Sequence, residues 1–368
     1  MRKRICALLC ALAMTFSLTA CGPKYEQMST TIFAMDTVMN LNLYHAQPAD
    51  AVRGMFNRAV ERVYAYERIL SATDEGSDIH NLNANGGQIV AVSRETADVL
   101  RRALALCEKT GGALDITAYP AVKAWGFTTG ENRVVGQAER EELAANIDYT
   151  KVELLGEYTA LPEGMTEENL QGLVNYEEHL EHGELVRIPE GMQLDLGAVA
   201  KGYVADRMAE EMQGYHALLD LGQSTITAIG TKPDGSAWRI GIQVPEGTDY
   251  LGVLELSDRS MGSSGNYQRW FEENGVRYGH IIDPDTAAPA ESALAGVTVV
   301  ADSALYCDGL GTALFVMGLE EACAYWREYR DFDAIFITDD GSIIITPGLK
   351  DAFTLREGYT DREVSVLE

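Results

Sequence analysis

The sequence predicts an α+β protein with mainly antiparallel sheets and packed helices. Candidate strands mostly adjoin other strands along the chain, and candidate helices fall between groups of strands instead of alternating with single ones. The 368 residues are 46% hydrophobic, which is enough for a large core. Neither a G-x-G-x-x-G after a candidate strand nor a G-x-x-x-x-G-K-[ST] is found, so the doubly wound parallel folds that use these loops are disfavoured.

The first twenty residues predict a removable signal. MRKR is basic, and the apolar run ICALLCALAMTFSL after it is shorter than the roughly 20 residues of a membrane span. LTAC then ends at Cys21 and resembles a bacterial lipobox, which implies cleavage before Cys21 and lipid (palmitate) on the mature N-terminus. The alternative is an ordinary secretory signal with a chance cysteine. We expect a signal peptide over 1–20, a tether over 21–30 and a lipid anchor on the extracytoplasmic face of the cell membrane.

The folded domain is expected over 31–355, followed by a tail over 356–368. Alternation of apolar residues predicts a strand over 31–44, and the polar, acidic stretch 128–190 predicts a surface insertion. Apolar residues at helical spacing predict the helices of this half of the chain, at 51–70, 94–110 and 137–146.

The second half is predicted to contain most of the strands. Short apolar runs such as HALLDLG, STITAIG, WRIGIQV, AIFITDD and SIIITP have the length and bounding turn residues of strands. Helical spacing predicts the helices of this half, at 199–213, 303–317 and 320–329.

Charge and cysteine usage exclude several classes. The net charge is −27, and no basic run occurs past residue 4, which argues against nucleic-acid binding. Beyond the signal and Cys21, the cysteines are Cys107, Cys307 and Cys323. None has C-x-x-C spacing, so zinc and redox motifs are unsupported. Their apolar contexts suit buried free thiols, although one disulfide among them is an open alternative.

The stretch 303–317, SALYCDGLGTALFVM, places Asp308 and Thr312 on one face of an otherwise small and apolar helix. A buried carboxylate requires a partner. One interpretation is structural: a hydroxyl bonded to a backbone carbonyl and an Asp–Lys pair. The other is two oxygen ligands for a hard cation such as magnesium, which uses few protein groups and keeps waters or phosphates.

Four other segments carry polar residues in apolar surroundings. Asp115 follows a helix stop, and Asp195 and Lys201 flank a strand-to-helix turn, where they form either a salt bridge or part of a site. His280 precedes a strand-like Ile-Ile and is structural or catalytic. MGSSGNYQRWF is either a plain hairpin or a site loop.

Taken together and in order, these segments resemble the FAD:protein FMN transferases of the ApbE family. The resemblance is carried by M-D-T at 35–37, L-S at 70–71 with Asn83, G-G-A-L-D-I-T at 111–117, D-L-G-A-V-A-K-G-Y at 195–203, S-S-G-N-Y at 263–267, H-I-I-D-P-x-T at 280–286 and D-G-L-G-T-A-L at 308–314. It covers about residues 30–350 and implies a T-fold-related architecture.

The resemblance implies an enzyme that cleaves FAD with the help of Mg²⁺ and attaches FMN through a phosphoester to a Thr or Ser of an extracytoplasmic or membrane protein, with AMP released. It implies metal ligation by the side chains of Asp308 and Thr312 and by the backbone carbonyl of Ala198. It implies FAD contacts at Met35, Ala113, Leu114, Asp115, Asp195, Lys201 and Gly311. His280 is the candidate general base, with Asp283 as an alternative base or as the residue that orients His280.

Three positions depart from the usual family pattern. Asp36 stands where a glycine is common, Ala72-Thr73 where an aromatic residue is common, and Gly222-Gln223 where two glycines are common. Flavin stacking is therefore expected to come from elsewhere. Two other functions stay open: a magnesium-dependent FAD pyrophosphatase that gives FMN and AMP, and a non-catalytic FAD-binding lipoprotein.

Overall fold

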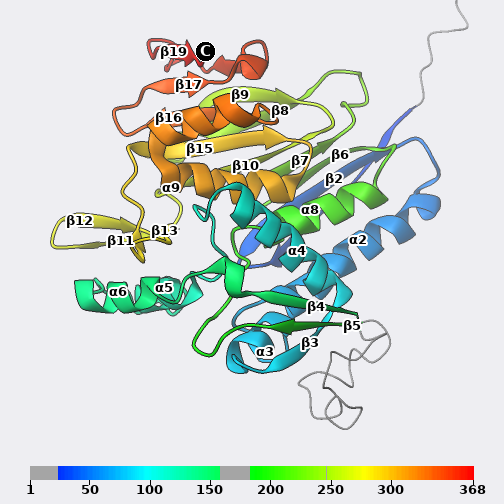
Figure 1. The fold of residues 1–368 in the computed structure, drawn as a ribbon. Coiled ribbons are helices and arrows are strands. Elements are labelled where there is room, and N and C mark those ends of the chain that lie inside the picture. Colours follow the sequence, from blue (N-terminus) through cyan, green and yellow to red (C-terminus); the bar gives the residue numbers. More distant parts are fainter. Residues whose placement is uncertain (1–23, 158–182, 246) are drawn as a thin grey trace, which may run out of the picture.

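The computed structural model describes residues 24–157, 183–245 and 247–368, and in them the α+β class is confirmed (Figure 1). A nine-stranded sheet runs in the order β1-β2-β6-β7-β10-β15-β16-β17-β19. All its neighbouring strands are antiparallel except β17 and β19. The strands are β1 (Glu26–Ala34), β2 (Thr37–His45), β6 (His216–Leu221), β7 (Thr225–Ile229), β10 (Arg259–Gly265), β15 (Leu294–Ala301), β16 (Asp333–Thr338), β17 (Ile343–Ile345) and β19 (Val364–Val366).

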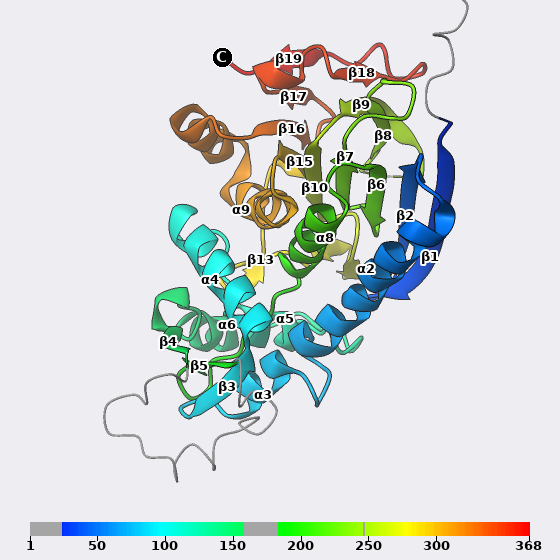
Figure 2. The same cartoon turned by 90° about the vertical axis from the view of Figure 1, so that its right-hand side faces the viewer.

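The helices pack mainly on one face of this sheet (Figure 2). Apolar side chains of α9 meet β15 and β16, and those of α2 and α8 join the core over β1, β2 and β6. The helices are α2 (Ala49–Leu70), α3 (Asp78–Ala84), α4 (Arg94–Lys109), α5 (Tyr119–Ala124), α6 (Gln137–Ala144), α8 (Ala200–Glu211) and α9 (Ala304–Tyr329), with short 3-10 turns at Tyr149–Lys151 and Pro347–Leu349. No helix in the described ranges is long and apolar enough to cross a membrane.

Smaller sheets complete the fold. A three-stranded sheet in the order β18-β9-β8 covers the other face of the large sheet. Its side chains share a core there with β7, β10 and β16. Both faces of β15 and β16 are thus covered, which explains their nearly continuous apolar sequences. The remaining strands are β3 (Ile89–Ser93), β4 (Glu153–Glu157), β5 (Gly183–Arg187), β8 (Trp238–Gln243), β9 (Tyr250–Leu256), β11 (Trp270–Glu273), β12 (Val276–Gly279), β13 (Ile282–Asp283), β14 (Ala288–Pro289) and β18 (Phe353–Leu355).

Four expectations from the sequence differ from the structure. The single strand over 31–44 is two strands, β1 and β2, joined by a turn at Met35 and Asp36. Because β1 begins at Glu26, half of the expected tether over 21–30 is strand. At the sides of the surface insertion expected over 128–190, β4 and β5 belong to the β3-β5-β4 sheet, and residues 158–182 of that insertion lie outside the described residues. The expected tail over 356–368 adds β19 to the large sheet through pairing with β17.

Most helix boundaries lie close to those expected. The helix expected over 199–213 is α8, and the pair expected at 303–317 and 320–329 is α9, whose helical geometry is interrupted at Gly318. The three cysteines beyond Cys21 are buried free thiols, without a disulfide among the residues that the structure describes. The predicted signal peptide and Cys21 lie outside the described residues.

Candidate functional site

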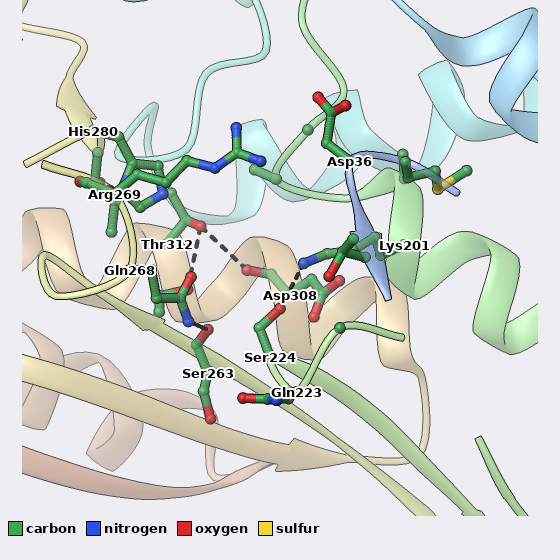
Figure 3. Close-up of a pocket in the computed structure, with 18 of the residues that line it drawn as sticks. Asp36, Lys201, Gln223, Ser224, Ser263, Gln268, Arg269, His280, Asp308 and Thr312 are labelled. Carbon is green, nitrogen blue, oxygen red and sulfur yellow. Dashed lines mark hydrogen bonds between the residues drawn. The ribbon is translucent and has the colours of Figure 1, made fainter. Parts of the chain in front are cut away.

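A cavity of about 1120 Å³ opens where the large sheet meets α2, α8 and α9. Figure 3 shows Lys201, Asp308 and Thr312 pointing into a common space, with Arg269 and His280 on another wall. The volume lies at the upper end of ligand pockets, so the cavity has room for a dinucleotide-sized ligand. Ten of the eleven candidate metal, nucleotide and catalytic residues line it: Met35, Ala113, Leu114, Asp115, Asp195, Ala198, Lys201, His280, Asp308 and Thr312.

Gly311 does not line the cavity, although it was expected beside the nucleotide. It lies on the face of α9 that packs against β10, where a Cβ atom would come 3.0 Å from Ser264 Oγ. In the described structure, therefore, Gly311 allows the helix to approach the strand closely.

Asp308 supplies the carboxylate of the predicted metal site, and this carboxylate is buried. Its residue is 8% exposed, and both carboxylate oxygens accept from Thr225 Oγ1 at 2.9 and 2.8 Å. The backbone N–H of Gly202 also donates to it. Burial raises the pKa of Asp308 to about 7, and the nearby charge of Lys201 only partly offsets this. No ion pair to Asp308 forms among the described residues, so the structure leaves this carboxylate without a cation.

The oxygen atoms around Asp308 fit a hard cation. Thr312 Oγ1 donates to the backbone carbonyl of Asp308 at 3.3 Å and lies 3.4 Å from Ser264 Oγ, and both distances are long for such bonds. Ala198 contributes a third possible oxygen through its carbonyl, and it lines the same cavity. Across the described ranges there is no cluster of three or more His, Cys, Asp or Glu side chains for a metal. One buried carboxylate with neutral oxygens is nevertheless a donor set that magnesium accepts when phosphates complete it.

Lys201 and Asp195 do not form the salt bridge that was the structural alternative. Lys201 Nζ donates to Ser224 Oγ at 2.5 Å, and Asp195 Oδ1 accepts from the backbone N–H of Gly197 at 2.9 Å. Asn83 holds the segment that leads to them, because its side chain bonds both the N–H and the C=O of Leu194 at 2.6 and 2.8 Å. Both charged groups therefore line the cavity without forming an ion pair with each other.

The carboxylate of Asp115 has a structural role. Oδ1 accepts from the N–H and hydroxyl of Thr117 at 2.8 and 2.7 Å, and Oδ2 accepts from the N–H of Tyr149 at 2.9 Å. Burial raises its pKa in spite of these three bonds. A ligand contact at 113–115 would accordingly come mainly from the backbone of this loop, which Gly111 and Gly112 enter with positive φ.

His280 has one ring nitrogen committed and one free. Nδ1 lies 3.1 Å from the carbonyl oxygen of Arg269, so Nδ1 must carry the proton and Nε2 is the acceptor. Burial lowers its pKa to about 4, and the charges of Arg269 and Lys201 act in the same direction. Asp283 accepts from the N–H of Asp285 and the hydroxyl of Thr286, and no bond to His280 is found in the described structure. Asp283 is therefore not the group that orients His280.

Several cavity residues escaped the sequence analysis. Arg269 lines the wall beside His280, and its guanidinium forms no ion pair among the described residues. Four aromatic side chains line the cavity and could stack on a planar ring: Tyr119, Phe127, Tyr250 and Tyr267. Their sequence signal was weak, since each is a single aromatic residue: Tyr119 begins α5, Tyr250 begins β9, and Phe127 and Tyr267 lie in turns. Asp36 and Gln223, which the sequence marked as departures from the family pattern, also line the cavity, both with positive φ.

Comparison with known proteins gives one consistent result. The model of the ApbE family matches residues 35–336. A Treponema pallidum protein named FAD:protein FMN transferase is 32% identical over 371 residues, covering 95% of this chain and 94% of that protein. A Haemophilus influenzae protein of the same name is 29% identical and covers 87% of this chain and 89% of its own length.

Solved structures agree with the sequence matches. An ApbE protein from Thermotoga maritima has a TM-score of 0.76 and 26% identity, covering 90% of this chain and 100% of that one. The flavin transferase ApbE from Vibrio cholerae has a TM-score of 0.72 and 27% identity, covering 89% of this chain and 100% of that one.

Proposed function

The chain belongs to the ApbE family, and on this premise we propose that it is an FAD:protein FMN transferase. It cleaves the diphosphate of FAD with the help of magnesium, attaches FMN through a phosphoester to a Thr or Ser of a partner protein, and releases AMP. The observation that carries this proposal is Asp308, a buried carboxylate without an ion-pair partner among the described residues, facing a dinucleotide-sized cavity.

Magnesium would be held by the side chains of Asp308 and Thr312 and by the carbonyl of Ala198. When bound, it neutralises negative charge on the diphosphate and on the departing AMP. The raised pKa of Asp308 supports this assignment, because a carboxylate that is costly to ionise alone is stabilised by a divalent cation.

Lys201 and Arg269 provide positive charge for the phosphates. In a protein of net charge −27, an anionic substrate needs local cations, and both residues line the cavity. Lys201 lies in the first turn of α8, and the positive end of the helix dipole there also favours negative charge. We assign the diphosphate to the space between Lys201 and Arg269.

His280 accepts the proton of the acceptor hydroxyl. Its Nε2 is unprotonated, and its lowered pKa keeps the ring neutral at physiological pH. The acceptor oxygen forms a bond to the FMN-side phosphorus while the bond from that phosphorus to the AMP oxygen breaks. The hydroxyl proton moves to His280 Nε2, and AMP leaves with the bonding electron pair.

We further propose that the mature protein is a lipoprotein anchored by Cys21 on the extracytoplasmic face. The support is the lipobox-like LTAC sequence alone. Expression of Cys21→Ser in the native host should move the protein from the membrane to the soluble fraction and remove palmitate labelling. A membrane-bound Cys21→Ser variant would contradict the anchor.

The proposed function is tested with a protein that starts after Cys21, mixed with FAD, magnesium and a purified FMN-binding domain carrying an S/T-G-A-T acceptor sequence. Flavin fluorescence should remain on the acceptor in a denaturing gel and should disappear with a chelator. FAD that binds but is never cleaved would contradict the transferase.

A further inference from the structure

The hairpin of β11 and β12 carries surface features that the proposed chemistry does not use. We propose that its outer face, formed by Trp270 and Arg277, is the docking surface for the acceptor protein. This inference rests on the proposed function, because only a transferase to protein needs such a surface. The occupant is the segment of the acceptor that flanks its target hydroxyl, with an apolar side chain placed against Trp270.

The two ends of the hairpin are joined to the cavity. Arg269 precedes β11 and His280 follows β12, and both line the cavity. The N–H of His280 donates to the carbonyl of Arg269 at 3.1 Å, and His280 Nδ1 bonds the same oxygen. A protein held on the hairpin would therefore lie next to the proposed base.

The inner face of the hairpin is packed against the body of the protein. Phe271 and Tyr278 face each other in the pairing, with ring centroids 5.2 Å apart. Tyr278 lies 5.4 Å from the Trp125 ring, and Phe271 lies 5.7 Å from the Phe127 ring. The hairpin is therefore held in place by the packing of its inner face, and Figure 1 shows it projecting beside α5 and α6.

The outer face carries a solvent-exposed aromatic ring with an arginine held against it. Trp270 is 46% exposed, whereas Trp125, Trp238 and Trp326 are 2–5% exposed. The guanidinium of Arg277 lies 4.0 Å from the centre of the Trp270 ring. Trp and Arg dominate the energetics of protein interfaces, and side chains already held in place lose less entropy when a partner binds.

Charge favours this place over the rest of the surface for a protein partner. The hairpin and its flanking arginine carry Arg269 and Arg277 against Glu272 and Glu273, so their charges cancel. The whole chain carries −27. An acidic acceptor is repelled by a strongly acidic protein surface but meets a neutral platform here.

The test measures binding separately from transfer. The probe is the same FMN-binding domain with its acceptor Thr replaced by Ala, titrated against the FAD-loaded protein by calorimetry. Trp270→Ala should weaken its binding by at least about tenfold, and Arg277→Ala by less. FAD affinity and thermal stability should not change. Tyr64→Ala is the matched control, because Tyr64 is 40% exposed on α2 and does not line the cavity.

Each other outcome is informative. Equal binding by the wild type and Trp270→Ala overturns the docking surface, while the transferase stands if the unmodified acceptor is still labelled. Binding that depends on Trp270 without any labelling overturns the transferase and leaves the docking surface intact. Self-association or vesicle binding that is lost in Trp270→Ala, with acceptor binding unchanged, assigns the face to another partner and overturns the proposal. No measurable wild-type binding also overturns it.

Discussion

The carboxylate of Asp308 is buried and interacts only with a hydroxyl, a backbone N–H and the nearby charge of Lys201, with which it forms no ion pair among the described residues. A buried charge without a close counter-ion is costly, so a structural reason alone would have favoured an apolar or amide residue. Its presence in the wall of a large cavity supports the proposed metal site.

Asp308→Asn should retain the fold and lose transfer. The amide oxygen can still accept from Thr225 Oγ1, but the negative charge that attracts magnesium is gone. We expect labelling of the acceptor to fall by roughly a thousandfold, as for other losses of electrostatic stabilisation at a reacting centre. Manganese binding, measured by electron paramagnetic resonance in the presence of FAD, should weaken in parallel. Full labelling by a well-folded Asp308→Asn would exclude the metal assignment.

From the lowered pKa of His280 we expect an unusual dependence of the transfer rate on pH. Its pKa is lowered to about 4 by burial, so the ring stays neutral and able to accept a proton well below the ordinary histidine range. At saturating magnesium, the rate should show no ionisation near 6.5 and should decline only toward pH 4. The folded state binds fewer protons than the unfolded state between these values, so the stability contribution of His280 is lost as pH falls through the same window.

The matched variant for this prediction is His280→Gln. It keeps a side chain able to donate to the Arg269 carbonyl but removes the base, so the rate should fall by about 10²–10⁴ with FAD affinity unchanged. An unaltered rate in His280→Gln, or a wild-type acid limb near 6.5, would show that another group takes the proton.

Residue types, spacing and the order of the motifs were sufficient to nominate ten residues of the cavity wall. Asp308 and Thr312 share a helix face, which spacing alone reveals, and the joint order of motifs added Lys201 and His280. Arg269 could not be found in this way, because an arginine in a loop is ordinary until the fold shows that its guanidinium forms no ion pair among the described residues and lies beside a cavity. The separation of Asp195 from Lys201 likewise depends on contacts with Gly197 and Ser224.

Among the elements, the contact between α8 and α9 sets the geometry of the site. A Cβ at Gly202 would lie 2.3 Å from the carbonyl oxygen of Ala304, so the helices touch through backbone. Gly202→Ala should destabilise the protein by about 1–3 kcal/mol through overpacking and displace Lys201 from Asp308. Denaturant unfolding and FAD affinity measure the two effects.

Gly54→Ala provides the contrasting control. Gly54 lies inside α2, and a Cβ there would meet only Arg58 Nη1 at 3.5 Å. The alanine should stabilise the protein by about 0.5–1 kcal/mol, because glycine is unfavourable in a helix interior. If both substitutions changed stability alike, close packing at Gly202 would not be the cause.

The prediction of a single strand over 31–44 was wrong because of the β1–β2 turn. A two-residue hairpin turn usually carries Asn-Gly or Asp-Gly, but Met35 and Asp36 occupy it here with φ of 49° and 57°. Without the turn signature, the alternation across it looked like one continuous strand. The backbone N–H of Met35 donates to Glu67 Oε1 at 2.6 Å, a long-range contact that helps to hold the turn and that local sequence does not reveal.

Asp36→Gly should therefore stabilise the protein by about 0.5–1 kcal/mol in denaturant unfolding, because glycine adopts positive φ without strain. Asp36 also lines the cavity, so a simultaneous loss of FAD affinity would indicate that the strained acid is kept for ligand contact. Loss of stability on this substitution would contradict the strain.

For the whole molecule, the fold class followed from sequence because strand-next-to-strand order strongly disfavours a parallel sheet. Two strand pairings could not be foreseen. β19 pairs in parallel with β17 from a polar C-terminal segment, and β5 becomes a central strand after a long acidic stretch. Both pairings are non-local and leave little pattern in the strand itself.

Net charge gives a prediction on this scale. At −27, self-repulsion opposes the compact state, and salt should relieve it. Raising sodium chloride from about 0.1 M to about 1 M shortens the Debye length from roughly 10 Å to 3 Å, so the melting temperature at pH 8 should rise. The effect should be much smaller near the sequence pI of about 4.5. Equal salt effects at both pH values would indicate a general salt effect instead of charge repulsion.

In the proposed function, cleavage of FAD is coupled to modification of a protein. The most direct measurement follows AMP release and flavin bound covalently to the acceptor in one reaction, with magnesium and excess acceptor. We expect one labelled acceptor for each AMP, and neither product when magnesium is chelated. AMP with an equal amount of free FMN and no labelled acceptor would contradict it and identify a pyrophosphatase.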